Sequence, residues 1–187
     1  MAEERQLSLQ EARAILTAIE HTQLRSDATV DDITRLCKEA VDADLGAVCV
    51  ASSWVQSARS CLSGHATRIV SVVGFPHGNA LSDAKALEAH RAVEEGAHEV
   101  DMVASIGRIK GRDLKYVERD ITLVVRAVPV PVKVILDTAL LTNDEIDLAC
   151  RVAEEAGAHF VKTSTGFGPG GATVEAVSRM RAAVGVR

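Results

Sequence analysis

Two side chains that could do chemistry stand at matching places in an internal repeat. Residues 96–101 (GAHEVD) align with residues 157–162 (GAHFVK), and a weaker copy ends at Ala51. One repeat therefore ends in a carboxylate, Asp101, and the other in an amine, Lys162. A desolvated lysine has a lowered pKa, so its neutral amine can form a Schiff base with a carbonyl compound. A carboxylate nearby can relay the proton that such a reaction moves.

Both residues also have a purely structural interpretation. Lys162 stands near the expected end of a strand, where it could lie in water or form an ion pair with Asp101. Asp101 could in turn be only the buried partner in that ion pair. The residue types and their spacing leave these alternatives open.

A glycine-rich loop follows Lys162. Residues 166–171 (GFGPGG) formally match the G-x-G-x-x-G fingerprint of dinucleotide sites. The match comes late in the chain, without room for the second strand and the acidic residue that the ribose needs, so the pattern does not favour a dinucleotide-binding domain. A glycine-rich turn before a helix can still hold a phosphate with its amides. An ordinary connecting loop is the alternative.

Phe75 and Lys133 are further candidates. Phe75, in the loop after an expected strand, could form the wall of a pocket. Lys133 alternates in phase with Asp137 on another expected strand, so it could project toward the site or toward the covering helices. The six histidines show no metal-binding spacing, and we therefore expect no metal ion.

The elements that would position these residues alternate between strand and helix. Capping signals and apolar residues three and four apart predict helices, and short apolar runs predict buried strands. Ser82 is the expected N-cap of one helix. The expected strands cover residues 19–24, 46–51, 69–74, 99–103, 132–136 and 159–162, and the expected helices cover residues 9–19, 30–41, 54–62, 83–93, 114–128, 143–152 and 173–184.

A leading helix and six strand–helix units predict an α/β protein with a parallel sheet. An open doubly wound sheet and a (β/α)8 barrel of the TIM type both fit this pattern. In a barrel, alternate strands share an interior layer, so Ala51, Asp101 and Lys162 would stand at one height on the second, fourth and sixth strands. We find no linker within residues 1–187 and expect a single domain.

The composition of the chain excludes several classes of protein. Of 187 residues, 47% are hydrophobic, which is enough for a sizeable core. A net charge of −5 without a Lys/Arg-rich run argues against nucleic acid as a partner. We expect neither a membrane span nor a secretory signal. Four cysteines without a CxxC motif predict reduced thiols in a cytoplasmic protein.

Five segments together resemble the deoxyribose-phosphate aldolase family. They are residues 72–78 (VVGFPHG), 99–103 (EVDMV), 132–138 (VKVILDT), 162–167 (KTSTGF) and 170–173 (GGAT), in the order of the family. The resemblance runs from about residue 16 to 184. It implies a (β/α)8 barrel and a class I aldolase without metal or other cofactor. Its partner would be a small phosphorylated sugar, 2-deoxy-D-ribose 5-phosphate, cleaved reversibly to acetaldehyde and D-glyceraldehyde 3-phosphate.

The resemblance also implies roles for single residues. Lys162 would form the Schiff base and Asp101 would relay the proton. Gly166 would lie near the phosphate of the sugar. The substrate-binding set that we expect is Cys49, Phe75, Lys133, Thr165 and Gly166. The oligomeric state stays open, with a homo-oligomer as one state to test.

The chain departs from the family pattern at several places. Glu20 and Gln23 stand where the family usually has Asp and Leu, Ala51-Ser52 where it often has Asn-Pro, and Phe167 where some members have lysine. The family pattern continues, beyond the length of this sequence, into a strand with a second active-site lysine and an eighth strand. Without that lysine, the amine of Lys162 is expected to be more fully protonated.

Six strands would leave an open barrel with two free edges. Two alternatives to a deoxyribose-phosphate aldolase follow. One is an inactive, incomplete barrel that needs a partner chain, and the other is a class I aldolase with a different substrate preference.

Overall fold

The computed structural model describes residues 8–185 and contains one six-stranded parallel sheet. The strands lie side by side in sequence order, with the first and the sixth at the edges. They are β1 (Glu20–Gln23), β2 (Ala47–Ala51), β3 (Arg68–Val73), β4 (Glu99–Val103), β5 (Val132–Ile135) and β6 (Phe160–Lys162). A doubly wound sheet would reverse its strand order at one point. The observed order is that of a barrel, so the sheet is a curled, incomplete barrel of the TIM type.

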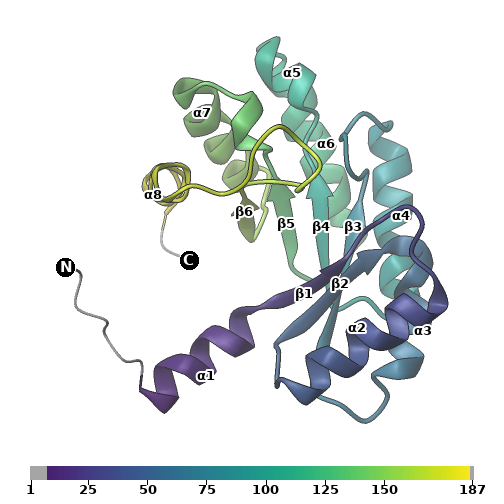
Figure 1. Ribbon diagram of the computed structural model, residues 1–187. Helices are drawn as coiled ribbons and strands as arrows, with labels where there is room; N and C mark the ends of the chain where they lie inside the picture. Colours follow the sequence, from purple (N-terminus) through teal and green to yellow (C-terminus); the bar gives the residue numbers. More distant parts are fainter. Residues whose placement is uncertain (1–7, 186–187) are drawn as a thin grey trace.

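The helices lie outside the sheet, and α1 projects away from it (Figure 1). None of the α1 residues is buried. Two short 3-10 turns, η1 (Ser52–Trp54) and η2 (Thr138–Leu140), follow β2 and β5. The helices are α1 (Leu9–Ala18), α2 (Val30–Asp42), α3 (Val55–Cys61), α4 (Ser82–Glu95), α5 (Ile106–Lys110), α6 (Leu114–Ala127), α7 (Asn143–Glu155) and α8 (Val174–Ala183). The sequence pattern missed α5, which is only five residues long.

Capping residues explain where several helices begin. Ser8 and Thr142 form capping boxes at the starts of α1 and α7, and Thr173 caps α8. The prediction for Ser82 is wrong: Ser82 is the first residue of α4, and its N-cap, Leu81, makes no side-chain capping bond. The Glu88 carboxylate of this helix instead accepts hydrogen bonds from Gly74 N and Ser52 Oγ. Tertiary contacts therefore replace the local cap in holding α4.

The outer face of the sheet carries the apolar core. On α2, Ile33, Leu36 and Ala40 recur three and four residues apart, and all are buried against outward-facing strand residues such as Val48 and Val50. A second, larger cluster joins β4 and β5 to α6 and α7. Burying each of the larger side chains, such as Ile33 or Leu36, contributes about 1.5–3 kcal/mol. This core leaves the inner face of the sheet free to hold charged groups.

The internal repeat has a structural cause at the start of β4 and β6. His98 Nδ1 accepts a hydrogen bond from Ile69 N at 3.0 Å, and His98 N donates to Ile69 O at 2.8 Å. His159 forms the same two bonds with Val132, at 3.2 and 2.9 Å. Each histidine therefore ties the first residues of its strand to the preceding strand, which fixes the position of the residues that follow.

Candidate active site

Inward-pointing side chains form two stacked layers on the concave face of the sheet. Asp101 is in register with Lys133, which is in register with Phe160. Lys162 lies two residues beyond Phe160 and thus points to the same face, because strand side chains alternate with a period of two. In an eight-stranded barrel of shear eight, the register slips by about one residue per strand. Lys162 therefore stands at the height of Asp101.

The same slip corrects one expectation. Ala51 pairs with Val72, which pairs with Asp101, so Ala51 is in direct register with Asp101 rather than at its height. Cys49, two residues earlier, takes that height. One layer is therefore formed by Cys49, Asp101 and Lys162 from the even strands, and the other by Glu20, Val70 and Lys133 from the odd strands.

Ion pairs join the two layers. Lys162 Nζ lies 2.5 Å from Asp101 Oδ2 and 2.9 Å from Glu20 Oε2. Lys133 Nζ lies 2.7 Å from Glu20 Oε1, 3.0 Å from Asp101 Oδ1 and 2.5 Å from Glu99 Oε2. Glu20 belongs to β1 and Lys162 to β6, so the sheet curls far enough for its two edge strands to exchange contacts.

Access differs sharply within this charged cluster. The side chain of Asp101 is fully buried, and that of Lys133 is 11% exposed. The side chain of Lys162 is 35% exposed. The side chain of Lys162 is therefore partly open to solvent, while the carboxylate that pairs with its amine stays shielded from water.

The charges around Lys162 decide its protonation. Burial alone would lower its pKa, but the negative charges of Asp101 and Glu20 outweigh burial and raise the pKa above its usual value. For Glu20, burial alone would raise the pKa of the carboxyl group. The ion pairs with Lys133 and Lys162 outweigh burial, so this pKa is lowered. The raised pKa of Lys162 agrees with the expectation of a more fully protonated amine, and it does not agree with the neutral amine expected from desolvation alone. Lys162 must lose a proton before it can attack a carbonyl group.

Cys49 and Phe75 lie beside the charged cluster. Burial first, and the charge of Asp101 second, raise the pKa of the Cys49 thiol to about 12, so it stays protonated at neutral pH. Phe75 packs against an apolar group that contains Cys49 and Val72. Its ring also meets Phe167 edge-on, with 5.3 Å between ring centroids. This contact joins the loop after β3 to the loop after β6.

Thr165 and Gly166 belong to the loop between β6 and α8. Thr165 is buried and donates hydrogen bonds from its N–H and its hydroxyl to Asp137. Gly166 is exposed and has a φ of +81°, a conformation that suits glycine. The expected roles of the two residues toward a substrate thus differ: Gly166 offers an open amide, and Thr165 is already engaged.

Sequence reasoning missed two members of the charged cluster. Glu20 stood out only as a departure from the family pattern, although its carboxylate contacts both lysines. Glu99, which also pairs with Arg68, was not considered. A usable signal existed: Glu99 precedes Asp101 by one strand period, so both must point to the same face.

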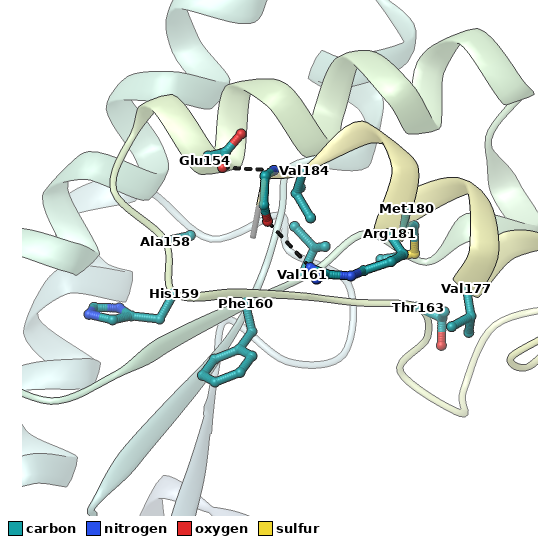
Figure 2. A pocket seen from close by; sticks show the side chains of 11 residues that line it. Glu154, Ala158, His159, Phe160, Val161, Thr163, Val177, Met180, Arg181 and Val184 are labelled. Carbon is teal, nitrogen blue, oxygen red and sulfur yellow. Dashed lines mark hydrogen bonds between the residues drawn. The ribbon is translucent and has the colours of Figure 1, made fainter. Parts of the chain in front are cut away.

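A separate hollow lies between β6 and α8, with a volume of about 270 Å³ (Figure 2). Val161, Val177 and Met180 are among the side chains that line it, and neither Lys162 nor Asp101 does. Because Val161 points to the opposite face of β6 from Lys162, this hollow is not the charged site. Among residues 8–185, no three His, Cys, Asp or Glu side chains are grouped as a metal site, and no helix could cross a membrane.

Comparison with known proteins places this fold and site in a family. The model of the DeoC/LacD family aldolases matches residues 14–185. The chain belongs to that family. Deoxyribose-phosphate aldolase 1 of Cutibacterium acnes is 49% identical over 175 residues, which are 93% of this chain and 81% of the relative. The deoxyribose-phosphate aldolase of Streptococcus gordonii is 48% identical over 168 residues, 89% of this chain and 76% of the relative.

Solved structures of this aldolase family share the fold. A proposed deoxyribose-phosphate aldolase from Coccidioides immitis superimposes with a TM-score of 0.90 at 40% identity, covering 92% of this chain and 69% of that one. The tetrameric deoxyribose phosphate aldolase of Aeropyrum pernix gives a TM-score of 0.84 at 28% identity, covering 93% and 74%. The barrel prediction is therefore confirmed, and the family makes this chain a class I aldolase.

Proposed function

We propose that this chain is a deoxyribose-phosphate aldolase that cleaves 2-deoxy-D-ribose 5-phosphate through a Schiff base at Lys162. The observation that carries the proposal is the partly exposed Lys162, whose amine lies 2.5 Å from the fully buried carboxylate of Asp101, on the concave face of an aldolase-family barrel. We infer the substrate from the relatives named above, which are deoxyribose-phosphate aldolases at 48–49% identity.

The reaction begins with a proton transfer. The Lys162 ammonium gives a proton to Asp101 or to water, and the neutral amine attacks C1 of the open-chain aldehyde. The resulting carbinolamine loses water, with Asp101 delivering the proton to the departing hydroxyl. The product is a positively charged imine that joins Lys162 to the sugar.

The charged imine then draws electrons from the carbon chain. The 3-hydroxyl gives up its proton to the carboxylate of Asp101, directly or through a water molecule. The C2–C3 bond breaks, and the electron pair of that bond forms an enamine. D-Glyceraldehyde 3-phosphate leaves, C2 takes up a proton, and water hydrolyses the imine to release acetaldehyde and Lys162. Lys133 keeps Asp101 and Glu20 in place through its ion pairs.

The loop formed by residues 166–171 is the part that we assign to the phosphate. Within residues 8–185, the amides of Gly166, Gly168, Gly170 and Gly171 donate no hydrogen bond to the protein. Such free donors before a helix N-terminus suit an anion. Phe75 and Phe167 would shield this end of the site from water.

Reductive trapping tests the assignment of Lys162. Incubation with acetaldehyde and borohydride should leave one ethyl group on the peptide that contains Lys162. Lys162→Ala should remove this adduct, whereas Lys38→Ala, which changes an exposed lysine on α2, should not. An adduct on another lysine, or none in the native chain, would overturn the proposed mechanism.

We also infer that the protein works in the cytoplasm and assembles with further copies of itself. Cys37, Cys49, Cys61 and Cys150 form no disulfide, which suits a reducing compartment. The related Aeropyrum pernix enzyme is tetrameric. Light scattering after gel filtration tests the assembly, and a monomer at micromolar concentration would refute it.

A further inference from the structure

We propose that Asp137 is a positioning residue that holds the loop of residues 166–171 in the shape that receives the phosphate. Asp137 lies at the end of β5, just before η2, and 5% of its surface is exposed. The inference rests on the proposed function only for the identity of the anion. The hold of Asp137 on the loop can be measured independently of any activity.

The backbone of Asp137 is itself unusual. Its φ of +48° and ψ of +57° lie in the left-handed region, which costs free energy for any residue with a Cβ. Among residues 8–185, only Asp44 and Arg112 are other non-glycine residues with positive φ, and both are exposed. A buried residue in this conformation must be held by surrounding contacts, and it points its side chain where an ordinary backbone would not.

The side chain of Asp137 points at the start of the glycine-rich loop. Asp137 Oδ1 accepts a hydrogen bond from Thr165 N at 3.4 Å, and Oδ2 accepts one from Thr165 Oγ1 at 3.3 Å. Thr165 Oγ1 then accepts a hydrogen bond from Phe167 N at 3.2 Å. The carboxylate thereby holds Thr165 directly, and it holds Phe167 of the loop through the Thr165 hydroxyl.

The loop also passes directly over the carboxylate. A Cβ at Gly168 would lie only 2.9 Å from Asp137 Oδ2, and a Cβ at Gly170 would lie 2.9 Å from the Ala139 side chain. Backbone bonds from Leu136 N to Lys162 O and from Thr138 N to Thr163 O hold the two chain segments together up to this point. The loop therefore packs against residues 137–139.

Charge gives no reason for a carboxylate at this place. A negative group beneath an anion-binding loop repels a phosphate, so Asp137 does not serve by attraction. Asp137 accepts hydrogen bonds from both donors of the buried Thr165, whereas the glycine amides of the loop donate no hydrogen bond within residues 8–185. A positioning role accounts for its burial, its backbone and its partners together.

Three variants test this role. Asp137→Gly keeps the left-handed backbone and removes the carboxylate, and Asp137→Asn keeps one acceptor oxygen. Asp44→Gly is the matched control, because it makes the same change at a left-handed but exposed aspartate between α2 and β2. Melting curves show whether each variant is folded.

The first measurement is hydrogen exchange of the peptide that spans residues 163–173, with inorganic phosphate as the anion probe. We expect Asp137→Gly to exchange faster in this peptide and to bind phosphate about tenfold more weakly, as the loss of a hydrogen bond to a charged group implies. Asp137→Asn should fall between it and the native chain. Asp44→Gly should match the native chain in both measurements.

The second measurement compares cleavage of 2-deoxyribose 5-phosphate with cleavage of 2-deoxyribose. Asp137→Gly should lose about tenfold more kcat/KM on the phosphorylated sugar than on the other, mostly through KM. A general loss of structure would lower both rates alike and would overturn the proposal, as would unchanged exchange and phosphate binding. If the native chain cleaves neither sugar while the exchange result holds, the proposed function fails and the positioning role stands.

Discussion

Two lysine–aspartate pairs of this protein have nearly the same geometry and very different surroundings. Lys85 Nζ lies 2.7 Å from Asp120 Oδ2, between α4 and α6, and neither side chain is exposed at all. Lys162 Nζ lies 2.5 Å from Asp101 Oδ2, and its side chain is 35% exposed. Lys85 also donates a hydrogen bond to the carbonyl oxygen of Val103, the last residue of β4. The Lys85–Asp120 pair therefore contacts the same strand that carries Asp101.

The difference lies in access and in the number of carboxylates. Lys85 meets one carboxylate and one carbonyl oxygen, whereas Lys162 meets two carboxylates. A sealed pair with a single partner can only hold helices together, because no solute reaches it. The partly exposed Lys162 can give up its proton, because Lys133 still pairs with the two carboxylates, Asp101 and Glu20, and holds them in place. A buried Lys–Asp pair alone is therefore no sign of a catalytic site.

Replacing each lysine by methionine should separate the two pairs most strongly. Lys162→Met should lower kcat by on the order of 10³-fold or more, because the nucleophile is lost. Lys85→Met should still be trapped by acetaldehyde and borohydride at Lys162. Steady-state kinetics with mass spectrometry of the trapped peptide measure both. Equal loss of trapping in the two variants would erase the distinction.

The two variants should differ in the opposite way in stability, with the larger loss for Lys85→Met. Lys85→Met leaves the buried charge of Asp120 without a partner, which costs about 3–5 kcal/mol of unfolding free energy. One oxygen of Asp120 already has no hydrogen-bond partner within the described residues, so the site has no spare donor to compensate. Urea denaturation followed by circular dichroism measures the change. The double variant Lys85→Met/Asp120→Leu should recover part of it, and a cost under 1 kcal/mol for the single variant would contradict this account.

The comparison also explains what the sequence could predict. Asp101 and Lys162 follow from the repeat, because strands with the same pattern two units apart share a layer in a barrel. Their contact is confirmed at 2.5 Å. Lys85 and Asp120 stand on the buried faces of α4 and α6, and Asp120 follows Val117 by three residues, so helical spacing does place it on the apolar face. What the spacing does not show is that the two residues pair with each other, because they stand on different helices.

The contribution of Glu20 to the protonation of Lys162 could not be predicted, because Glu20 is 142 residues away in sequence. The pattern gave the strand that carries Glu20 but not the curl of the sheet that brings β1 to β6. The height of Ala51 was missed for a related reason. The slip of register between strands is a property of the whole sheet, and no single strand encodes it.

Glu20→Gln sharpens the role of the second carboxylate. The charge of Glu20 favours the protonated form of Lys162, so its removal should lower the lysine pKa and leave more neutral amine at a given pH. The rise of kcat/KM with pH should shift by roughly one unit toward lower pH. The pH–rate profile measures this, with Glu118→Gln on the exposed face of α6 as the control. A shift toward higher pH would show that Glu20 acts otherwise.

The repeat histidines, which directly precede β4 and β6, offer the smallest test. His98→Ala removes the acceptor for Ile69 N, and His159→Ala removes the acceptor for Val132 N. Each change should cost about 1 kcal/mol of unfolding free energy, whereas His65→Ala, at an exposed position, should cost much less.

Their effects on activity should differ, because the two strands present different groups. His159 lies directly before β6, which carries the one-third exposed Lys162, while His98 precedes β4, which stays paired on both sides. We therefore expect His159→Ala to lower kcat more than His98→Ala at equal loss of stability. Equal effects would mean that the free edge of β6 needs no more support than a strand in the middle of the sheet.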